Sequence, residues 1–248
     1  MSPGNILPNI PTPQFPAAPN TGIIFKRIDE PDSIPVKADP FNITDTRLCT
    51  AIGSGVSKIS TIEHLMAAFV GLSIDNAYIE IDNEEVPILD GSAAPFFDQL
   101  SAVGVEAQNA PCKVFVCKKD FEVKVDSSLI RIEPFEGLRF DCEIDFSTVS
   151  SAIGRQRLCL NYTEDAFAYL CEARTFCHVN DVNKMRELGL ARGGSLDNAI
   201  VVDDKNVING EGLRYDNEFV RHKLLDCIGD LAVLGGRLQG KVTLLKPG

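Results

Sequence analysis

Two short stretches of the chain carry side chains that could bind a metal ion and activate water. His222 and Asp226 are four residues apart in a segment with helical periodicity, so both side chains would lie on one face of a helix. Glu63 and His64 are neighbours at the predicted start of a second helix. Two histidines, one aspartate and one water make a tetrahedral zinc site with an open position, and Glu63 would remain beside it as an unligated carboxylate. Together the two stretches indicate metal-assisted hydrolysis.

Each stretch has a simpler interpretation when it is taken alone. A histidine and an aspartate at this spacing usually form a helix ion pair. Glu63 has the spacing from Ser60 that is typical of a helix capping box, in which case His64 is a half-buried imidazole with a structural role. The combination of the two stretches is what favours a metal site.

Hydrophobic periodicity predicts the elements that must position these residues. One helix begins at Ser60 or Thr61 and runs to Gly71, and a long helix runs from about 217 to 234. Further helices are predicted at 95–103, 165–174 and 182–188, and strands at 76–82, 114–116, 121–125, 129–132, 138–146 and 199–202. This order of elements predicts an α+β fold.

An internal repeat indicates two similar parts. The sequence SIDNAYI at 73–79 is answered by SLDNAIV at 195–201, which predicts a duplicated α+β unit. The alternative is chance recurrence of a turn followed by a strand, because Asp-Asn is a common turn pair. We expect a proline-rich leader over residues 1–20, a first domain over 21–108 and a second over 109–248.

Composition limits the partners and the compartment. The net charge of −11 and the lack of any run of five basic residues disfavour nucleic acid, although an anionic small molecule stays open. The eight cysteines form no C-x-x-C pair and no secretory signal precedes them, so we expect reduced thiols and a cytoplasmic protein. The longest apolar stretch, at 65–74, is far shorter than the ~20 residues of a transmembrane helix. The sequence gives no oligomeric state.

Motifs of two other hydrolase classes are incomplete. An inverted metalloprotease motif needs H-x-x-E-H, and its first position here is Ser60. The segment 235–242 is similar to a phosphate-binding loop, but Val242 replaces the required Ser or Thr and the segment follows a helix. The sequence therefore argues against a protease and against a P-loop nucleotidase.

Five longer motifs resemble, in order, those of the UDP-3-O-acyl-N-acetylglucosamine deacetylases, zinc hydrolases of lipid A biosynthesis in Gram-negative bacteria. They are STIEHLMAA at 60–68, VPILDGSA at 86–93, EARTF at 172–176, GGS at 193–195 and EFVRHK at 218–223. The resemblance covers about residues 20–248. It implies two similar α+β domains, each a sheet packed on helices, with the helical layers facing each other and the metal site at their interface.

The resemblance implies a role for each residue of the metal site. His64, His222 and Asp226 would bind Zn²⁺, and Fe²⁺ also suits such ligands. Glu63 would be the general base for the attacking water. Thr175 would help to stabilise the oxyanion.

Further residues are implied for substrate binding and positioning. Lys223 would lie near the substrate's diphosphate or the oxyanion, and Asp230 would orient a histidine. Phe176 is a candidate contact for the nucleoside or diphosphate end. Met185 and Leu196 are candidate linings of an apolar passage over 182–200 that would hold the acyl chain of the UDP-sugar. Core packing explains these apolar residues equally well.

The chain departs from the family pattern at both ends. The proline-rich leader stands where the family has a strand pair with a glycine-rich turn, and the family's general-acid histidine follows position 248. A missing acid would lower the rate by ~10²- to 10⁴-fold. Two functions are therefore open: a truncated deacetylase that releases acetate, with impaired activity, and a non-catalytic module of the same fold that binds zinc or a sugar nucleotide.

Overall fold

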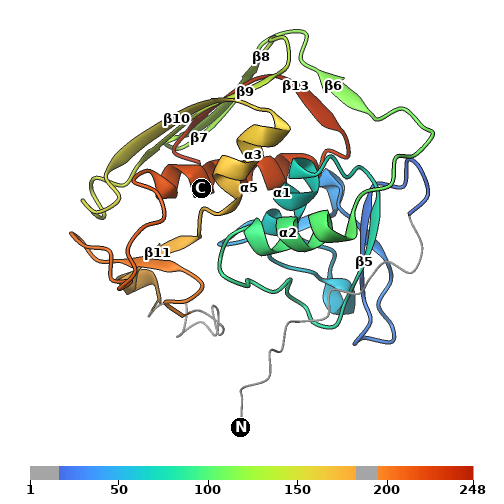
Figure 1. The fold of residues 1–248 in the computed structure, drawn as a ribbon, viewed down its shortest axis with the longest axis horizontal. Coiled ribbons are helices and arrows are strands. Elements are labelled where there is room, and N and C mark those ends of the chain that lie inside the picture. Colours follow the sequence, from blue (N-terminus) through green and yellow to red (C-terminus); the bar gives the residue numbers. More distant parts are fainter. Residues whose placement is uncertain (1–16, 183–194, 248) are drawn as a thin grey trace.

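The computed structural model describes residues 17–182 and 195–247. A six-stranded sheet lies along one side of the molecule, above the helices α3 and α5 (Figure 1). Its strand order is β10-β9-β13-β8-β7, and β6 pairs with β13. These strands are β6 (Val114–Val116), β7 (Phe121–Val125), β8 (Ser128–Glu133), β9 (Leu138–Asp145), β10 (Arg155–Asn161) and β13 (Arg237–Leu245).

A smaller sheet and a layer of helices complete the fold. The order of the small sheet is β2-β1-β5, and it is formed by β1 (Ile23–Arg27), β2 (Val36–Lys37) and β5 (Ala77–Ile81). The helices are α1 (Glu63–Gly71), α2 (Ala94–Val103), α3 (Glu164–Cys171) and α5 (Glu218–Ala232). Two short pairs remain: β3 (Ile43–Asp45) with β4 (Ala51–Ile52), and β11 (Phe176–His178) with β12 (Ile200–Val202). The predicted α+β class is confirmed.

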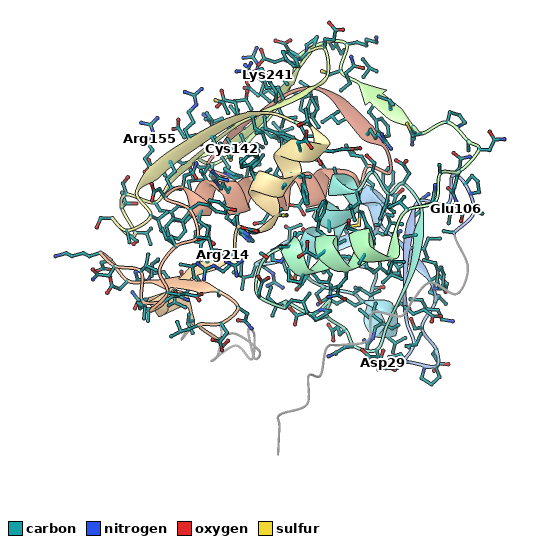
Figure 2. The ribbon with its side chains drawn as sticks, in the orientation of Figure 1. Asp29, Glu106, Cys142, Arg155, Arg214 and Lys241 are labelled. Carbon is teal, nitrogen blue, oxygen red and sulfur yellow. The ribbon has the colours of Figure 1, made fainter. Side chains whose placement is uncertain are left out.

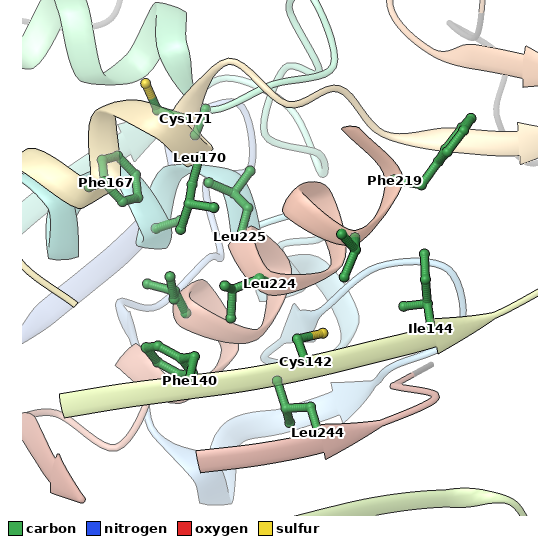
Figure 3. Close-up of a cluster of buried hydrophobic side chains, with 14 of the residues drawn as sticks. Phe140, Cys142, Ile144, Phe167, Leu170, Cys171, Phe219, Leu224, Leu225 and Leu244 are labelled. Carbon is green, nitrogen blue, oxygen red and sulfur yellow. The ribbon is translucent and has the colours of Figure 1, made fainter. Parts of the chain in front are cut away.

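Side chains along β9 alternate between a buried and a solvent-facing side of the large sheet. Phe140, Cys142 and Ile144 are buried and pack with Leu224 of α5, as Figure 3 shows. The intervening carboxylates on the other face pair with arginines of β10, among them Arg155, which projects from the outer side of the sheet (Figure 2). Successive side chains of a strand point to opposite faces, so a sheet with one buried face requires this period-2 pattern.

The buried side chains form two clusters, one associated with each sheet. The larger cluster joins the large sheet to α3 and α5, and the smaller one joins the small sheet to α1 and α2. The helices α1 and α5 pack directly on each other between them. A division of the chain into domains at 108/109 stays a prediction.

The close packing of α1 on α5 depends on Gly229. A Cβ atom built on Gly229 would lie 2.0 Å from the backbone oxygen of Glu63, far inside van der Waals contact. Glycine inside a helix normally costs about 1 kcal/mol relative to alanine. Here the missing side chain lets the two backbones approach at the turn of α1 that carries Glu63 and His64.

Gly229→Ala is expected to destabilise the fold by about 1–3 kcal/mol, because the new methyl group forces α1 and α5 apart. Urea unfolding measures this change. Gly210→Ala is the matched control, since nothing lies within 4 Å of a Cβ there, and it should stay within about 0.5 kcal/mol of the parent. A Gly229→Ala variant as stable as the parent would contradict the close contact.

The predicted start of the first helix is wrong. Helix α1 begins at Glu63 with Ile62 as its N-cap and without a side-chain capping bond. The Glu63 carboxylate accepts a hydrogen bond from the Thr50 backbone N–H, whereas the Ser60 N–H donates to the backbone carbonyl of Glu84. There is therefore no capping box, because the carboxylate is recruited by a residue 13 positions earlier in the sequence.

Other elements agree with the sequence in part. The helix predicted at 165–174 ends earlier, at Cys171, whose carbonyl accepts the N–H of Ala93 from a distant segment. The sequence did not predict the strands β1, β2, β3, β4, β10, β11 and β13. Both copies of the repeat lead into a short strand, β5 or β12, that pairs in parallel with an earlier strand. Residues 183–188 of the helix predicted at 182–188, and most of the leader, lie outside the described residues.

Candidate metal centre

Helices α1 and α5 bring His64, His222 and Asp226 together. The Nε2 atoms of His222 and His64 lie 3.2 and 3.5 Å from Asp226 Oδ1. The two imidazole rings meet edge to face, with 5.0 Å between their centroids. One ligand atom from each of the three residues lies within 4.8 Å of the others. The i, i+4 spacing on α5 supplies two of these side chains, and the α1–α5 contact supplies the third.

The three side chains fit a tetrahedral divalent ion. Ligand atoms about 2.0–2.1 Å from a tetrahedral zinc lie about 3.3 Å from one another, close to the two distances to Asp226 Oδ1. Asp226 Oδ1 and His64 Nδ1 are buried, and neither atom has a hydrogen-bond partner within the described part of the chain. A buried carboxylate oxygen between two imidazole nitrogens is a set of donors that suits an ion.

His222 is held in the neutral form that metal ligation requires. Its Nδ1 lies 2.9 Å from the Ala173 carbonyl oxygen, which can only accept, so Nδ1 carries the proton and the Nε2 lone pair faces Asp226. Burial lowers the pKa of His222 to about 4. Neutral imidazole and ionised carboxylate are the forms that bind metal.

The charges around Asp226 favour a cation. Burial raises the pKa of Asp226, but His222, His64 and Lys223 together more than offset this effect and leave the pKa below its ordinary value. Burial lowers the pKa of His64, yet the nearby Asp226 and Glu63 leave it raised. Each shift comes from neighbours of opposite charge, so the pocket favours an ionised Asp226 with a positive charge beside it.

Glu63 lies beside the three residues without belonging to their group. Its side chain is buried, and its Oε2 accepts the Thr50 N–H at 2.9 Å. Burial raises the pKa of Glu63 to about 7, with Asp226 adding to the effect and His64 opposing it. A carboxylate with a raised pKa can both accept and return a proton near neutrality.

Thr175 is positioned by a turn from the first half of the chain. Its N–H donates to the Gly91 carbonyl at 2.7 Å, and its own carbonyl accepts the Ile200 N–H at 2.8 Å. Gly91 has a φ of +83°, and a Cβ there would lie 2.1 Å from the Asn198 oxygen. Only glycine allows this approach, which explains one position of the VPILDGSA motif.

Lys223 and Phe176 flank the cluster. Lys223 Nζ lies 3.6 Å from Asp226 Oδ2 and 5.6 Å from the centre of the Phe176 ring. The Phe176 ring also packs edge to face against Phe146, Phe219 and His222. Phe176 therefore has a packing role next to the site, and a contact with substrate stays a prediction.

Asp230 lies one turn beyond Asp226 and contacts a residue that the sequence did not single out. Its Oδ1 accepts the Thr50 hydroxyl at 2.5 Å. Burial of part of the side chain raises the pKa of Asp230 to about 6, and the hydrogen bond from Thr50 offsets this rise only in part. The rest of the residue reaches solvent. Orientation of a histidine by Asp230 stays a prediction.

The two candidate linings of the acyl passage differ in what is known of them. Met185 lies outside the described residues. Leu196 is 48% exposed, and its carbonyl accepts the Asn209 side-chain amide at 2.8 Å. Exposure of a leucine is compatible with a role in binding an apolar chain.

An ion pair between Glu218 and Arg174 fixes the start of α5. Glu218 and Arg174 are 0% and 1% exposed. Glu218 Oε1 accepts Arg174 Nε at 2.9 Å, and its Oε2 accepts the Arg214 N–H at 2.6 Å. Arg174 also pairs with Glu211. The pair therefore holds the EARTF segment against the helix that carries His222.

Glu218→Gln is expected to destabilise the protein by about 3–5 kcal/mol, because the buried Arg174 cation loses its buried charge partner and keeps only the exposed Glu211. Burial raises the pKa of Glu218, but the bonds from Arg174 and Arg214 leave it below 4.5. Its contribution is therefore complete above pH 4.5 and is lost as the pH falls through the folded-state pKa. Urea unfolding from pH 7 to pH 3 measures both effects.

Arg155→Ala is the control for this prediction. Arg155 forms an exposed pair with Glu143, and such pairs contribute about 1 kcal/mol or less. Equal losses of stability in the two variants would show that the buried Glu218–Arg174 pair contributes no more to stability than an exposed pair.

These features together define a class of protein. An α+β chain with two histidines and an aspartate buried between packed helices, and a separate carboxylate beside them, has the residues of a metal-dependent hydrolase. Within residues 17–182 and 195–247, no helix has the length and hydropathy that crossing a bilayer requires.

Comparison with known proteins gives the family. Residues 13–248 match the family described as LpxC, UDP-3-O-acyl N-acetylglycosamine deacetylase. The chain is 47% identical to the UDP-3-O-acyl-N-acetylglucosamine deacetylase of Acidithiobacillus ferrooxidans over 234 residues, which are 94% of this chain and 77% of that protein. It is 44% identical to the protein of the same name from Thioalkalivibrio sulfidiphilus, with the same coverage. The chain belongs to this deacetylase family, and the predicted resemblance is confirmed.

The sequence did not single out two contacts of the site. The Ala173 carbonyl sets the tautomer of His222, and Thr50 bonds both Glu63 and Asp230. Ala173 falls inside the EARTF motif but offers only its backbone. Thr50 lies 13 residues before Glu63, in no pattern that predicts such a contact.

Proposed function

We propose that this deacetylase is a zinc-dependent hydrolase that removes acetate from UDP-3-O-acyl-N-acetylglucosamine. The observation that carries the proposal is the buried group of His64, His222 and Asp226 with Glu63 beside it, in a member of this family. The names of the two relatives support the acylated UDP-sugar as substrate. The proposal includes a place in lipid A biosynthesis and in the cytoplasm.

His64, His222 and Asp226 would hold the ion. When bound, zinc supplies Lewis-acid chemistry, because it makes water more acidic and polarises a carbonyl group. Fe²⁺ suits the same donor set. Neutral His222 and ionised Asp226 are the forms that their pKa directions favour.

Glu63 moves the protons of the reaction. It takes a proton from the attacking water, whose oxygen forms a bond to the acetamide carbonyl carbon. As the carbon–nitrogen bond breaks, protonated Glu63 returns this proton to the leaving nitrogen. The second proton of the water passes from the new carboxyl group to the amine, so that acetate and the ammonium form of the amine result. A pKa of about 7 suits both transfers by Glu63.

Thr175 and Lys223 would stabilise negative charge. The bond to Gly91 fixes the backbone of Thr175 two residues after Ala173, whose carbonyl contacts His222. The Thr175 hydroxyl would donate to the oxyanion. Lys223, near Asp226 and over the Phe176 ring, would offset charge on the oxyanion or on the diphosphate. Phe176, Leu196 and Met185 are the proposed contacts with the rest of the substrate.

The proposal is tested by the products. Metal-loaded protein should convert UDP-3-O-acyl-N-acetylglucosamine to equal amounts of acetate and free amine, measured by mass spectrometry. UDP-N-acetylglucosamine without the acyl chain should react much more slowly if the acyl group is bound. Absence of acetate from the acylated substrate, with metal present, would refute the proposed activity.

A further inference from the structure

Thr50 connects the two helices that carry the candidate metal centre. It is buried and lies directly before β4. Its backbone N–H donates to Glu63 Oε2 at 2.9 Å, and its backbone carbonyl accepts the Ile62 N–H at 3.2 Å. Both bonds go to the first turn of α1, where the carboxylate next to the cluster begins the helix.

The side chain of Thr50 makes the connection to α5. Its Oγ1 donates to Asp230 Oδ1 at 2.5 Å, across 180 positions of sequence. Asp230 follows Asp226 by one helical turn, so this bond fixes a second carboxylate on the same face of α5. A single residue thereby sets the positions of two carboxylates, one through its backbone and one through its hydroxyl.

We propose that Thr50 is a positioning residue of the deacetylation site, which holds Glu63 by its N–H and Asp230 by its hydroxyl. The inference rests on the proposed function, since it assigns these carboxylates to the reaction. The Thr50 N–H and hydroxyl are both engaged with carboxylates outside the group of His64, His222 and Asp226. Thr50 therefore acts through Glu63 and Asp230, whose orientation determines how well they meet a bound substrate.

The two contacts of Thr50 can be separated by substitution. Thr50→Val keeps the shape and the backbone bonds to α1 and removes only the hydroxyl donor to Asp230. Thr50→Ser keeps the donor and removes a methyl group. Thr44→Val is the matched control, because the Thr44 hydroxyl donates to the Gly53 carbonyl in an exposed strand.

Steady-state kinetics with metal-loaded protein gives the first test. Thr50→Val should lower kcat about 10- to 100-fold, as loss of an orienting hydrogen bond typically does, with KM and bound metal nearly unchanged. Thr50→Ser should restore most of kcat, and Thr44→Val should leave it unchanged. An unchanged kcat in Thr50→Val, or a loss in Thr50→Ser as large as in Thr50→Val, would overturn the proposal.

A double-mutant cycle in urea unfolding makes the test independent of activity. Thr50→Val should lower the unfolding midpoint in the parent protein and have little effect when Asp230 is already alanine, because its partner is then absent. Equal shifts in both backgrounds would overturn the Thr50–Asp230 link, whatever the activity. If the cycle shows coupling and the parent releases no acetate, the proposed deacetylation fails and the positioning contact stands.

Discussion

Asp226→Ala should abolish metal binding and acetate release together. Asp226 Oδ1 is the atom common to both short distances of the cluster, 3.2 Å to His222 and 3.5 Å to His64. Its removal takes away the negative charge that stabilises a cation at this place. We expect about one ion per chain in the parent and almost none in the variant, measured by atomic spectroscopy after gel filtration.

The control for this prediction is Asp216→Ala. Asp216 is an exposed carboxylate in the turn before α5, and its loss should change neither the metal content nor the rate. Circular dichroism should show that both variants fold. A folded Asp226→Ala protein that keeps a full equivalent of metal would contradict the assignment of Asp226 as a ligand.

Glu63→Gln should separate metal binding from chemistry. The glutamine side-chain oxygen can still accept the Thr50 N–H, so the start of α1 should be preserved. Glutamine cannot take a proton from water, and loss of a general base lowers the rate about 10²- to 10⁴-fold. We expect kcat to fall by this factor while the metal content stays at that of the parent.

Glu164→Gln is the matched control for Glu63→Gln. Glu164 accepts one neutral hydrogen bond, from the Ser73 hydroxyl at 2.8 Å, and it is exposed at the start of α3. Its substitution should leave kcat unchanged. Full activity in Glu63→Gln would exclude Glu63 as the base, and loss of metal together with activity would instead make Glu63 a ligand.

The sequence predicted the part of the site that local geometry determines. The spacing of His222 and Asp226 places both side chains on one helix face wherever that helix lies in the fold. His64 entered the predicted site through the combination of the two stretches and through the resemblance, because no local rule relates residue 64 to residue 222. The contact of α1 with α5 confirms that these residues meet.

Contacts between distant positions account for what the sequence did not predict. The spacing of Ser60 and Glu63 indicated a capping box, but the carboxylate bonds Thr50, and Thr61 adopts a left-handed φ of +59° before the helix begins. Strand β13 was not predicted, because its glycines gave the segment 235–242 a similarity to a phosphate-binding loop. A Cβ at Gly240 would lie 3.1 Å from both the Cys117 side chain and the Glu133 oxygen, so the neighbouring strands leave little room for a side chain there.

The most direct test of zinc-dependent deacetylation is a titration of metal-free protein with Zn²⁺, in which acetate release from UDP-3-O-acyl-N-acetylglucosamine is measured after each addition. We expect no release at the start and a linear rise that stops at about one ion per chain, because His64, His222 and Asp226 are the one such group within residues 17–182 and 195–247. Acetate release by the metal-free protein at the full rate, or a rate that does not respond to Zn²⁺ or Fe²⁺, would contradict this expectation.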